Sequence, residues 1–268
     1  IPIAPPPESP RTAALTAPTA SDPSPGAASP AAGGPVPSGT PRLDDLLGGG
    51  FPESAQVLVT GDSYFGQDLL VYAFLGEGLK RGEPVVIVTA DRSASEIAEA
   101  AQRVIPDLPR QERAGRVLFV EAAPSPGTDP GAAGDSADHA RLLRSVVEAV
   151  RRAEATSSGR MRVGFFGLSG VFNQRGERSG LLFVQNLLAI LKTRRSLGVF
   201  AADDGALSEE QVGTLLGRMD GAIEFKQEEE RTFVRVRGLK EAETLDWVEC
   251  RESEGTLLIG SFELAEAH

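Results

Sequence analysis

The residues best placed to do chemistry lie in the stretch 61–68, which reads GDSYFGQD. It follows an apolar run and precedes a helical pattern, as does a phosphate-binding loop of the form G-x-x-x-x-G-K-[ST]. In that loop the lysine reaches the terminal phosphates and the hydroxyl binds Mg²⁺. Here Gly61 and Gly66 keep the spacing, but Gln67 replaces the lysine and Asp68 replaces the hydroxyl residue. The loop therefore keeps the frame of a phosphate site without its chemistry.

Charge and size in this loop oppose nucleotide binding. The positive charge of the lysine is absent, and Asp62 and Asp68 add carboxylates. Two like charges about 4 Å apart repel by roughly 1 kcal/mol in bulk water and about 4 kcal/mol at an effective dielectric near 20. Tyr64 and Phe65 stand where small residues usually let the backbone wrap phosphates. We therefore expect no cofactor and no metal; the alternative is that Asp68 holds Mg²⁺, which in turn holds ATP.

The composition is that of a folded, acidic protein. The chain has 268 residues, 41% of them hydrophobic, with a formal net charge of −11 and a pI of about 4.8. Nucleic-acid-binding domains are typically basic, so we expect no nucleic-acid partner. The single cysteine, Cys250, excludes an intrachain disulfide and favours a reducing compartment. Because the sequence has neither a membrane-spanning apolar run nor a secretion signal, the expected location is the cytoplasm.

The first 36 residues differ from the rest of the chain. Residues 1–36 hold ten of the nineteen prolines, mixed mainly with Ala, Ser, Thr and Gly. Such a segment cannot bury enough apolar surface to offset the entropy of ordering, which predicts a disordered Pro/Ala-rich linker. We expect this linker to tether the folded part, residues 37–268, to a further domain. A proline-rich recognition motif is the alternative.

From residue 37 onward, short apolar runs alternate with amphipathic helical patterns. This alternation predicts an α/β fold with a mostly parallel central sheet covered on both faces. The expected core strands are the runs at 56–60, 85–89, 117–121, 163–166 and 198–202. Beyond residue 220 the strands follow one another directly, which predicts an antiparallel extension of the sheet.

Local signals mark the helices and one loop. Ser93 with Glu96, and Ser208 with Gln211, have the spacing of capping boxes at helix starts. The stretch 123–138, rich in Pro, Gly and acidic residues, predicts a long surface loop. Two sets of apolar residues recur at helical spacing and are the expected core faces of their helices: Leu142, Leu143, Val146, Val147 and Val150, and then Leu181, Val184, Leu187, Leu188 and Leu191.

With these features in order, residues 37–268 resemble the KaiC branch of the RecA-type P-loop ATPases. The resemblance rests on PSGTPRLDDLLGGGFPES at 37–54, EGLKRGEPVVIVTADRS at 77–93, DGAIEFKQ at 220–227 and RVRG at 235–238. It implies a three-layer RecA-like P-loop NTPase fold. It also makes self-association conceivable, since such domains assemble into rings.

Carried over by position, the resemblance implies degenerate Walker A and Walker B motifs. Gln67 and Asp68 fall on the phosphate-binding lysine and the Mg²⁺-binding threonine of the family, and Phe166 falls on the Mg²⁺-associated aspartate. Asp91 falls on the catalytic carboxylate and is the one survivor of the set. A carboxylate that activates water needs the phosphate clamped by cations first. We therefore expect no catalytic residues.

Two arginines near the C-terminus are interface candidates. Arg235 and Arg237 match a Lys-x-Arg-Gly segment whose basic residues, in the family, reach the nucleotide of the next subunit. One interpretation is a retained interface that meets an acidic neighbouring loop, such as Asp62 and Asp68. The other is that both are exposed strand residues paired with the acidic run QEEE at 227–230.

The sequence thus predicts a catalytically inactive domain, a pseudo-ATPase, that serves as a scaffold or regulatory module and binds another protein or a second copy of itself. The alternative is residual ATP binding and hydrolysis in a ring oligomer.

Other chemistry has less support. His139 and His268 form no ligand pattern with Cys250. Ser169 lacks a suitably placed histidine, and Trp247 is expected to pack against the sheet.

Overall fold

The computed structural model describes residues 34–61, 66–121, 135–157, 159–175, 177–203, 205–239 and 246–260. The expectations for Asp62, Tyr64, Phe65 and His268 lie outside these residues, as does most of the expected linker. The described residues belong to one compact unit. No described helix is both long enough and apolar enough to cross a membrane.

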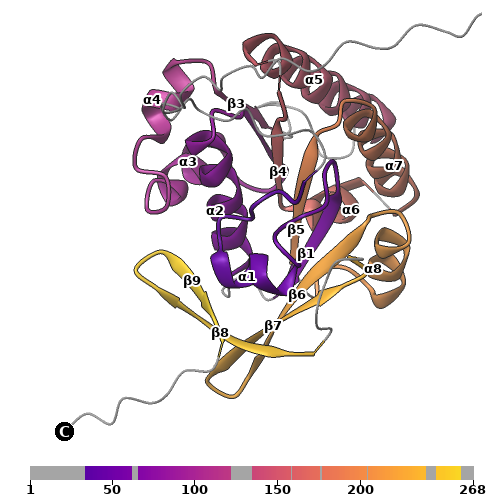
Figure 1. The fold of residues 1–268 in the computed structure, drawn as a ribbon. Coiled ribbons are helices and arrows are strands. Elements are labelled where there is room, and N and C mark those ends of the chain that lie inside the picture. Colours follow the sequence, from indigo (N-terminus) through magenta and orange to yellow (C-terminus); the bar gives the residue numbers. More distant parts are fainter. Residues whose placement is uncertain are drawn as a thin grey trace, which may run out of the picture. The chain divides into compact units, whose positions relative to one another are not determined.

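A nine-stranded sheet runs through the middle of this unit, in the order β3-β2-β4-β5-β1-β6-β7-β8-β9 (Figure 1). The strands are β1 Gln56–Gly61, β2 Val85–Thr89, β3 Val117–Glu121, β4 Arg162–Phe166, β5 Leu197–Asp203, β6 Gly221–Glu228, β7 Arg231–Arg237, β8 Val248–Ser253 and β9 Thr256–Ile259. Strands β1 to β6 pair in parallel, and β7, β8 and β9 extend the sheet antiparallel. The predicted α/β class, its five core strands and the antiparallel extension are confirmed.

Helices cover both faces of the sheet. They are α1 Pro41–Leu46, α2 Gln67–Lys80, α3 Ala94–Ala101, α4 Leu108–Arg113, α5 Asp135–Thr156, α6 Leu168–Arg175, α7 Glu177–Thr193 and α8 Glu209–Leu216. Buried side chains of α1 to α4 join one core cluster, and those of α5 to α8 join the other. Every residue of β2 and β4 is buried, because a strand in the middle of three layers has no solvent-facing side.

Both predicted capping boxes are present. Ser93 accepts a hydrogen bond from the backbone N–H of Glu96, whose carboxylate accepts one from the N–H of Ser93. Ser208 and Gln211 make the same reciprocal pair at the start of α8. These contacts satisfy backbone donors that have no partner inside the helix.

Three expectations need correction. Val36, placed in the linker by composition, is fully buried and exchanges two backbone hydrogen bonds of 2.7 Å with Phe51. Residues 135–138, expected in a loop, form the first turn of α5. Leu143, Val147 and Leu181, expected in core faces, are only half-buried; Leu143 and Leu181 still pack against the core cluster, and Leu143 and Val147 lie at the edge of the apolar stripe whose centre is Val146.

Candidate functional site

The residues singled out around the glycine loop meet at one edge of the sheet. In a parallel sheet the carboxyl ends of the strands lie on the same side, which is where such folds bind ligands. Gln67 and Asp68 open α2 after β1, Asp91 follows β2, and Asp203 ends β5. The fold thus brings three carboxylates and one amide into a small region.

Gln67 cannot act as the missing lysine, and its side chain is engaged elsewhere. The residue is 3% exposed, and its Nε2 donates a hydrogen bond of 3.0 Å to Asp203 Oδ1. The preceding residue, Gly66, caps α2 in the left-handed region, with φ of +80°. A Cβ at this position would lie 3.1 Å from the ring of Phe225, so both the turn and the packing favour glycine.

Asp68 is paired with a cation supplied by the chain itself. Arg92 Nη1 lies 2.6 Å from Asp68 Oδ2, and Arg92 Nε lies 3.7 Å from Asp91 Oδ1. The guanidinium carbon also lies 5.6 Å from the centre of the Phe166 ring. Burial lowers the pKa of Arg92, but the hydrogen bond and charge of Asp68 outweigh it and raise the pKa above its ordinary value. The guanidinium therefore stays charged and bridges two carboxylates.

Asp91 lies against the backbone that follows β4. Partial burial raises its pKa above the ordinary value, Arg92 lowers it, and the negative charges of Asp203 and Asp68 raise it. Gly167 adopts φ of +68°, and a Cβ there would lie 2.1 Å from Asp91 Cγ. Only glycine allows this approach, so the position of the carboxylate depends on the glycine after β4.

Phe166 brings an aromatic ring to the end of β4, where the resemblance places the metal-associated aspartate. It is fully buried and packs against Tyr72 of α2 with 5.1 Å between ring centres. Burial also raises the pKa of the Tyr72 hydroxyl, with a further contribution from the charge of Asp68. The end of β4 thus offers a core side chain and no oxygen ligand.

The residues present do not fit a Mg²⁺-bound triphosphate. Gln67 and Asp68 are occupied by Asp203 and Arg92, and Phe166 has no oxygen for a metal. In the described ranges, no three His, Cys, Asp or Glu side chains are grouped so as to hold a metal ion. The side chains of the site instead form hydrogen bonds and ion pairs with one another.

The two interface candidates pair with a different acid from the one expected. Arg235 Nε lies 2.9 Å from Glu224 Oε2, and Arg237 Nη1 lies 2.8 Å from Glu224 Oε1. The interpretation that pairs them with the acidic run 227–230 is wrong in its partner, because the antiparallel register places Arg235 directly opposite Glu224. The other interpretation, an interface with an acidic neighbouring loop, stays a prediction. The arginines form part of the lining of an open pocket of about 480 Å³ between α8, β6 and β7.

Trp247 lies in the same pocket between two cations. Lys226 Nζ and Arg235 Cζ each lie 4.3 Å from the centre of its ring. The expected packing against the sheet is present, through side chains of β6 and β7. Cation–π contacts of this kind orient the arginine beside the ring.

The remaining candidates are structural. The buried imidazole of His139 stacks on Phe183 at 5.2 Å between ring centres, and its Nδ1 lies 2.6 Å from Ser179 Oγ. Ser169 Oγ donates a hydrogen bond of 3.4 Å to Asp203. Burial raises the pKa of the Cys250 thiol to about 12, so this cysteine is an inert core residue.

Two residues of the site were missed by sequence reasoning, Arg92 and Asp203. Arg92 had a signal, since it stands beside Asp91 directly after a core strand, where a cation can meet carboxylates from neighbouring strands. Asp203 also ends a core strand. A search of the carboxyl ends of all predicted parallel strands would have found both.

Comparison with known proteins gives a family and several relatives. The family described as "ATPase: KaiC" matches residues 36–254. The circadian clock protein KaiC3 of Synechocystis sp. is 27% identical over 164 residues, which are 61% of this chain and 31% of that protein. A UPF0273 protein of Pyrobaculum aerophilum is 34% identical over 87 residues, which are 32% of this chain and 31% of the relative. The chain therefore spans about a third or less of these curated relatives.

Among solved structures, a KaiC-like protein from Pyrococcus horikoshii OT3 has the same fold. It superimposes with a TM-score of 0.70 at 21% sequence identity, over 85% of this chain and the whole of that one. This likeness confirms the expected RecA-like three-layer architecture.

Proposed function

The chain belongs to the KaiC family of ATPase domains, and we propose that it is a member that does not hydrolyse ATP and works as a scaffold or regulatory protein-interaction module. The ion pair between Arg92 and Asp68 is the observation that carries this proposal. It occupies the first turn of α2, the part of a phosphate-binding loop that receives phosphate and metal.

Charge explains why this pair opposes nucleotide binding. Phosphoryl transfer in such folds depends on a lysine and Mg²⁺ that neutralise the phosphates. Here Asp68 and Asp91 face the guanidinium of Arg92, and the charge of Asp203 also acts on Asp91. A triphosphate would meet an excess of carboxylates, and to reach Arg92 it would have to displace Asp68.

The rest of the molecule supports a binding role. The sheet and its two helical layers belong to one compact unit, and Arg235 and Arg237 lie at its surface on β7. In this proposal the partner is another protein or a second copy of the chain, the proline-rich segment 1–36 is a tether, and the location is the cytoplasm. No ATP or Mg²⁺ is needed for these roles.

A nucleotide titration tests the proposal. The parent chain is mixed with a fluorescent ATP analogue and Mg²⁺, and fluorescence anisotropy is followed to about 1 mM protein. This range detects binding with a Kd up to about 1 mM, a binding free energy near about −4 kcal/mol. We expect no saturable signal. Asp68→Ala and Glu99→Ala remove one carboxylate each, the second on the exposed side of α3 outside the site. Micromolar binding that Asp68→Ala abolishes and Glu99→Ala leaves intact would instead favour the alternative, a residual ATPase working as a ring.

A further inference from the structure

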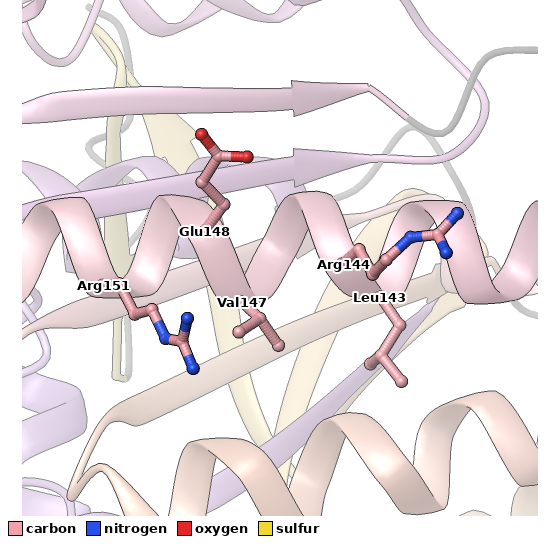
Figure 2. A pocket seen from close by; sticks show the side chains of 5 residues that line it. All are labelled: Leu143, Arg144, Val147, Glu148 and Arg151. Carbon is pink, nitrogen blue, oxygen red and sulfur yellow. The ribbon is translucent and has the colours of Figure 1, made fainter.

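The outer face of α5 carries a pocket that lies away from the glycine loop. Leu142, Val146 and Val150 of this helix are buried in the core, whereas Leu143 and Val147 are half-buried and line an open pocket of about 400 Å³. The other lining residues, also from α5, are Arg144, Glu148 and Arg151 (Figure 2).

The lining residues are arranged by chemistry along the helix. Leu143 and Val147 are four residues apart and so lie one above the other on the same side. Figure 2 shows Leu143, Val147 and Arg151 pointing to that side, whereas Glu148 points to the opposite side of α5. Arg144 and Arg151 are seven residues apart, about 10.5 Å along the helix axis. A short apolar floor is thus bordered by one arginine near each end.

Among the residues that the structure describes, several arginines have a carboxylate partner, and the two arginines of this pocket do not. Arg81, Arg92, Arg162 and Arg194 each form an ion pair within the chain. Within the part of the chain that the structure describes, Arg144 and Arg151 are exposed and make no ion pair within 4 Å. The chain as a whole has a net charge of −11. Two cations without a carboxylate partner beside an apolar floor favour an acidic partner.

We propose that this pocket of α5 docks an acidic amphipathic helix of a partner protein. Apolar side chains of the partner helix lie on Leu143 and Val147, and two carboxylates seven residues apart reach Arg144 and Arg151. An α-helix is the matching shape because its own side chains repeat after two turns with the same spacing as the arginines. A nucleic-acid backbone would leave the apolar floor without a partner, and the chain as a whole is acidic.

A designed peptide tests this docking site. The probe is a fluorescein-labelled helical peptide with Glu at positions i and i+7 and Leu at i+3 and i+4, titrated with the full 268-residue chain by fluorescence anisotropy. We expect binding that weakens with added salt, because exposed charges are screened. The double variant Arg144→Glu with Arg151→Glu should weaken binding at least about tenfold.

A matched control separates this site from the effect of net charge. Arg110→Glu with Arg113→Glu changes the charge of the chain by the same amount at exposed positions of α4, and it should leave peptide binding unchanged. A second peptide with Lys at both Glu positions should not bind. Circular dichroism melting shows that each variant is folded.

Three results would overturn the proposal. The first is that the acidic peptide does not bind, and the second is that both double variants lose peptide binding equally. The third is self-association in sedimentation that Arg144→Glu with Arg151→Glu abolishes, because this would assign the pocket to a second copy of the chain. Since the pocket lies outside the glycine loop, its failure leaves the nucleotide titration unaffected, and the reverse also holds.

Discussion

Arg92 Nη1 lies 2.6 Å from Asp68 Oδ2, so the first turn of α2 is neutralised from within the chain. The two residues come from different elements, since Asp68 opens α2 and Arg92 follows β2. The helix dipole stabilises the negative charge of an aspartate in this turn. The same negative charge cancels the attraction that the helix N-terminus would offer to a phosphate. The pair therefore links the stability of this turn to the proposed absence of nucleotide binding.

A double-mutant cycle measures how strongly this pair is coupled. We compare the parent, Arg92→Ala, Asp68→Ala and the double variant by urea unfolding. Both side chains are about one-third exposed, so we expect a coupling of about 1 kcal/mol in the free energy of unfolding. Purely additive effects would show that the two charges do not interact in solution.

Asp91 provides a pH-dependent test. Its folded-state pKa is raised, first by partial burial, above the unfolded value near 3.8. Between these two values the folded state binds more protons, so the contribution of Asp91 to stability is largest below the unfolded pKa and falls as pH rises through the folded pKa. Asp91→Asn cannot ionise, so it removes the decrease in stability that Asp91 causes as pH rises. The variant should be more stable than the parent at pH 7 by up to about 1 kcal/mol in the free energy of unfolding.

Thermal unfolding at several pH values checks the Asp91 prediction. The difference between Asp91→Asn and the parent should shrink toward zero below about pH 4, where the unfolded carboxyl is protonated. Asp45→Asn, at a side chain that is 67% exposed, is the control. A variant less stable than the parent at pH 7 would show that the ionised carboxylate is stabilised by Arg92 more than it is destabilised by burial.

Breaking the buried ion pair between Arg162 and Glu83 should change the free energy of unfolding more. Arg162 is fully buried, lies 2.6 Å from Glu83 through Nε, and donates hydrogen bonds of 2.8 Å to the carbonyls of Pro37 and Phe74. Glu83→Gln leaves a buried guanidinium without its counter-charge, which should cost about 3–5 kcal/mol in the free energy of unfolding.

The control for this pair is Asp45→Asn, which breaks the exposed pair with Arg42. Exposed pairs of this kind contribute about 0.3–0.5 kcal/mol, so its unfolding midpoint in urea should hardly move. Similar losses in Glu83→Gln and Asp45→Asn would mean that Arg162 finds another partner when Glu83 is neutralised.

The sequence predicted the fold well because strand and helix patterns are local. Apolar runs of five residues and two capping boxes are readable without knowing what packs against them. The site was predicted only in part, because its contacts join residues far apart in the chain: 24 positions separate Asp68 from Arg92, and 136 separate Gln67 from Asp203. Spacing showed which residues end strands, but the pairs between those ends depend on strand order.

Two further differences have the same physical origin. Helical spacing places Leu143 and Val147 on the apolar side of α5, but it cannot show where the neighbouring layer ends and solvent begins. The partner of Arg235 and Arg237 depends on strand register, which is set by the β6–β7 turn and places Glu224 opposite Arg235. In both cases the sequence indicated the kind of contact that each residue makes, but not which residues or solvent it contacts.

Restoring the loop sequence alone should not restore hydrolysis. Gln67→Lys with Asp68→Thr returns the two residues that a phosphate-binding loop requires. Phe166 still gives the end of β4 a fully buried ring in contact with Tyr72, with no oxygen for a metal. The double variant also leaves Arg92 without its main carboxylate partner. Phosphate release from ATP with Mg²⁺ should therefore equal that of the parent chain. Turnover above that level would show that Phe166 does not stand at the metal-associated position and that another carboxylate, such as Asp203, can serve there.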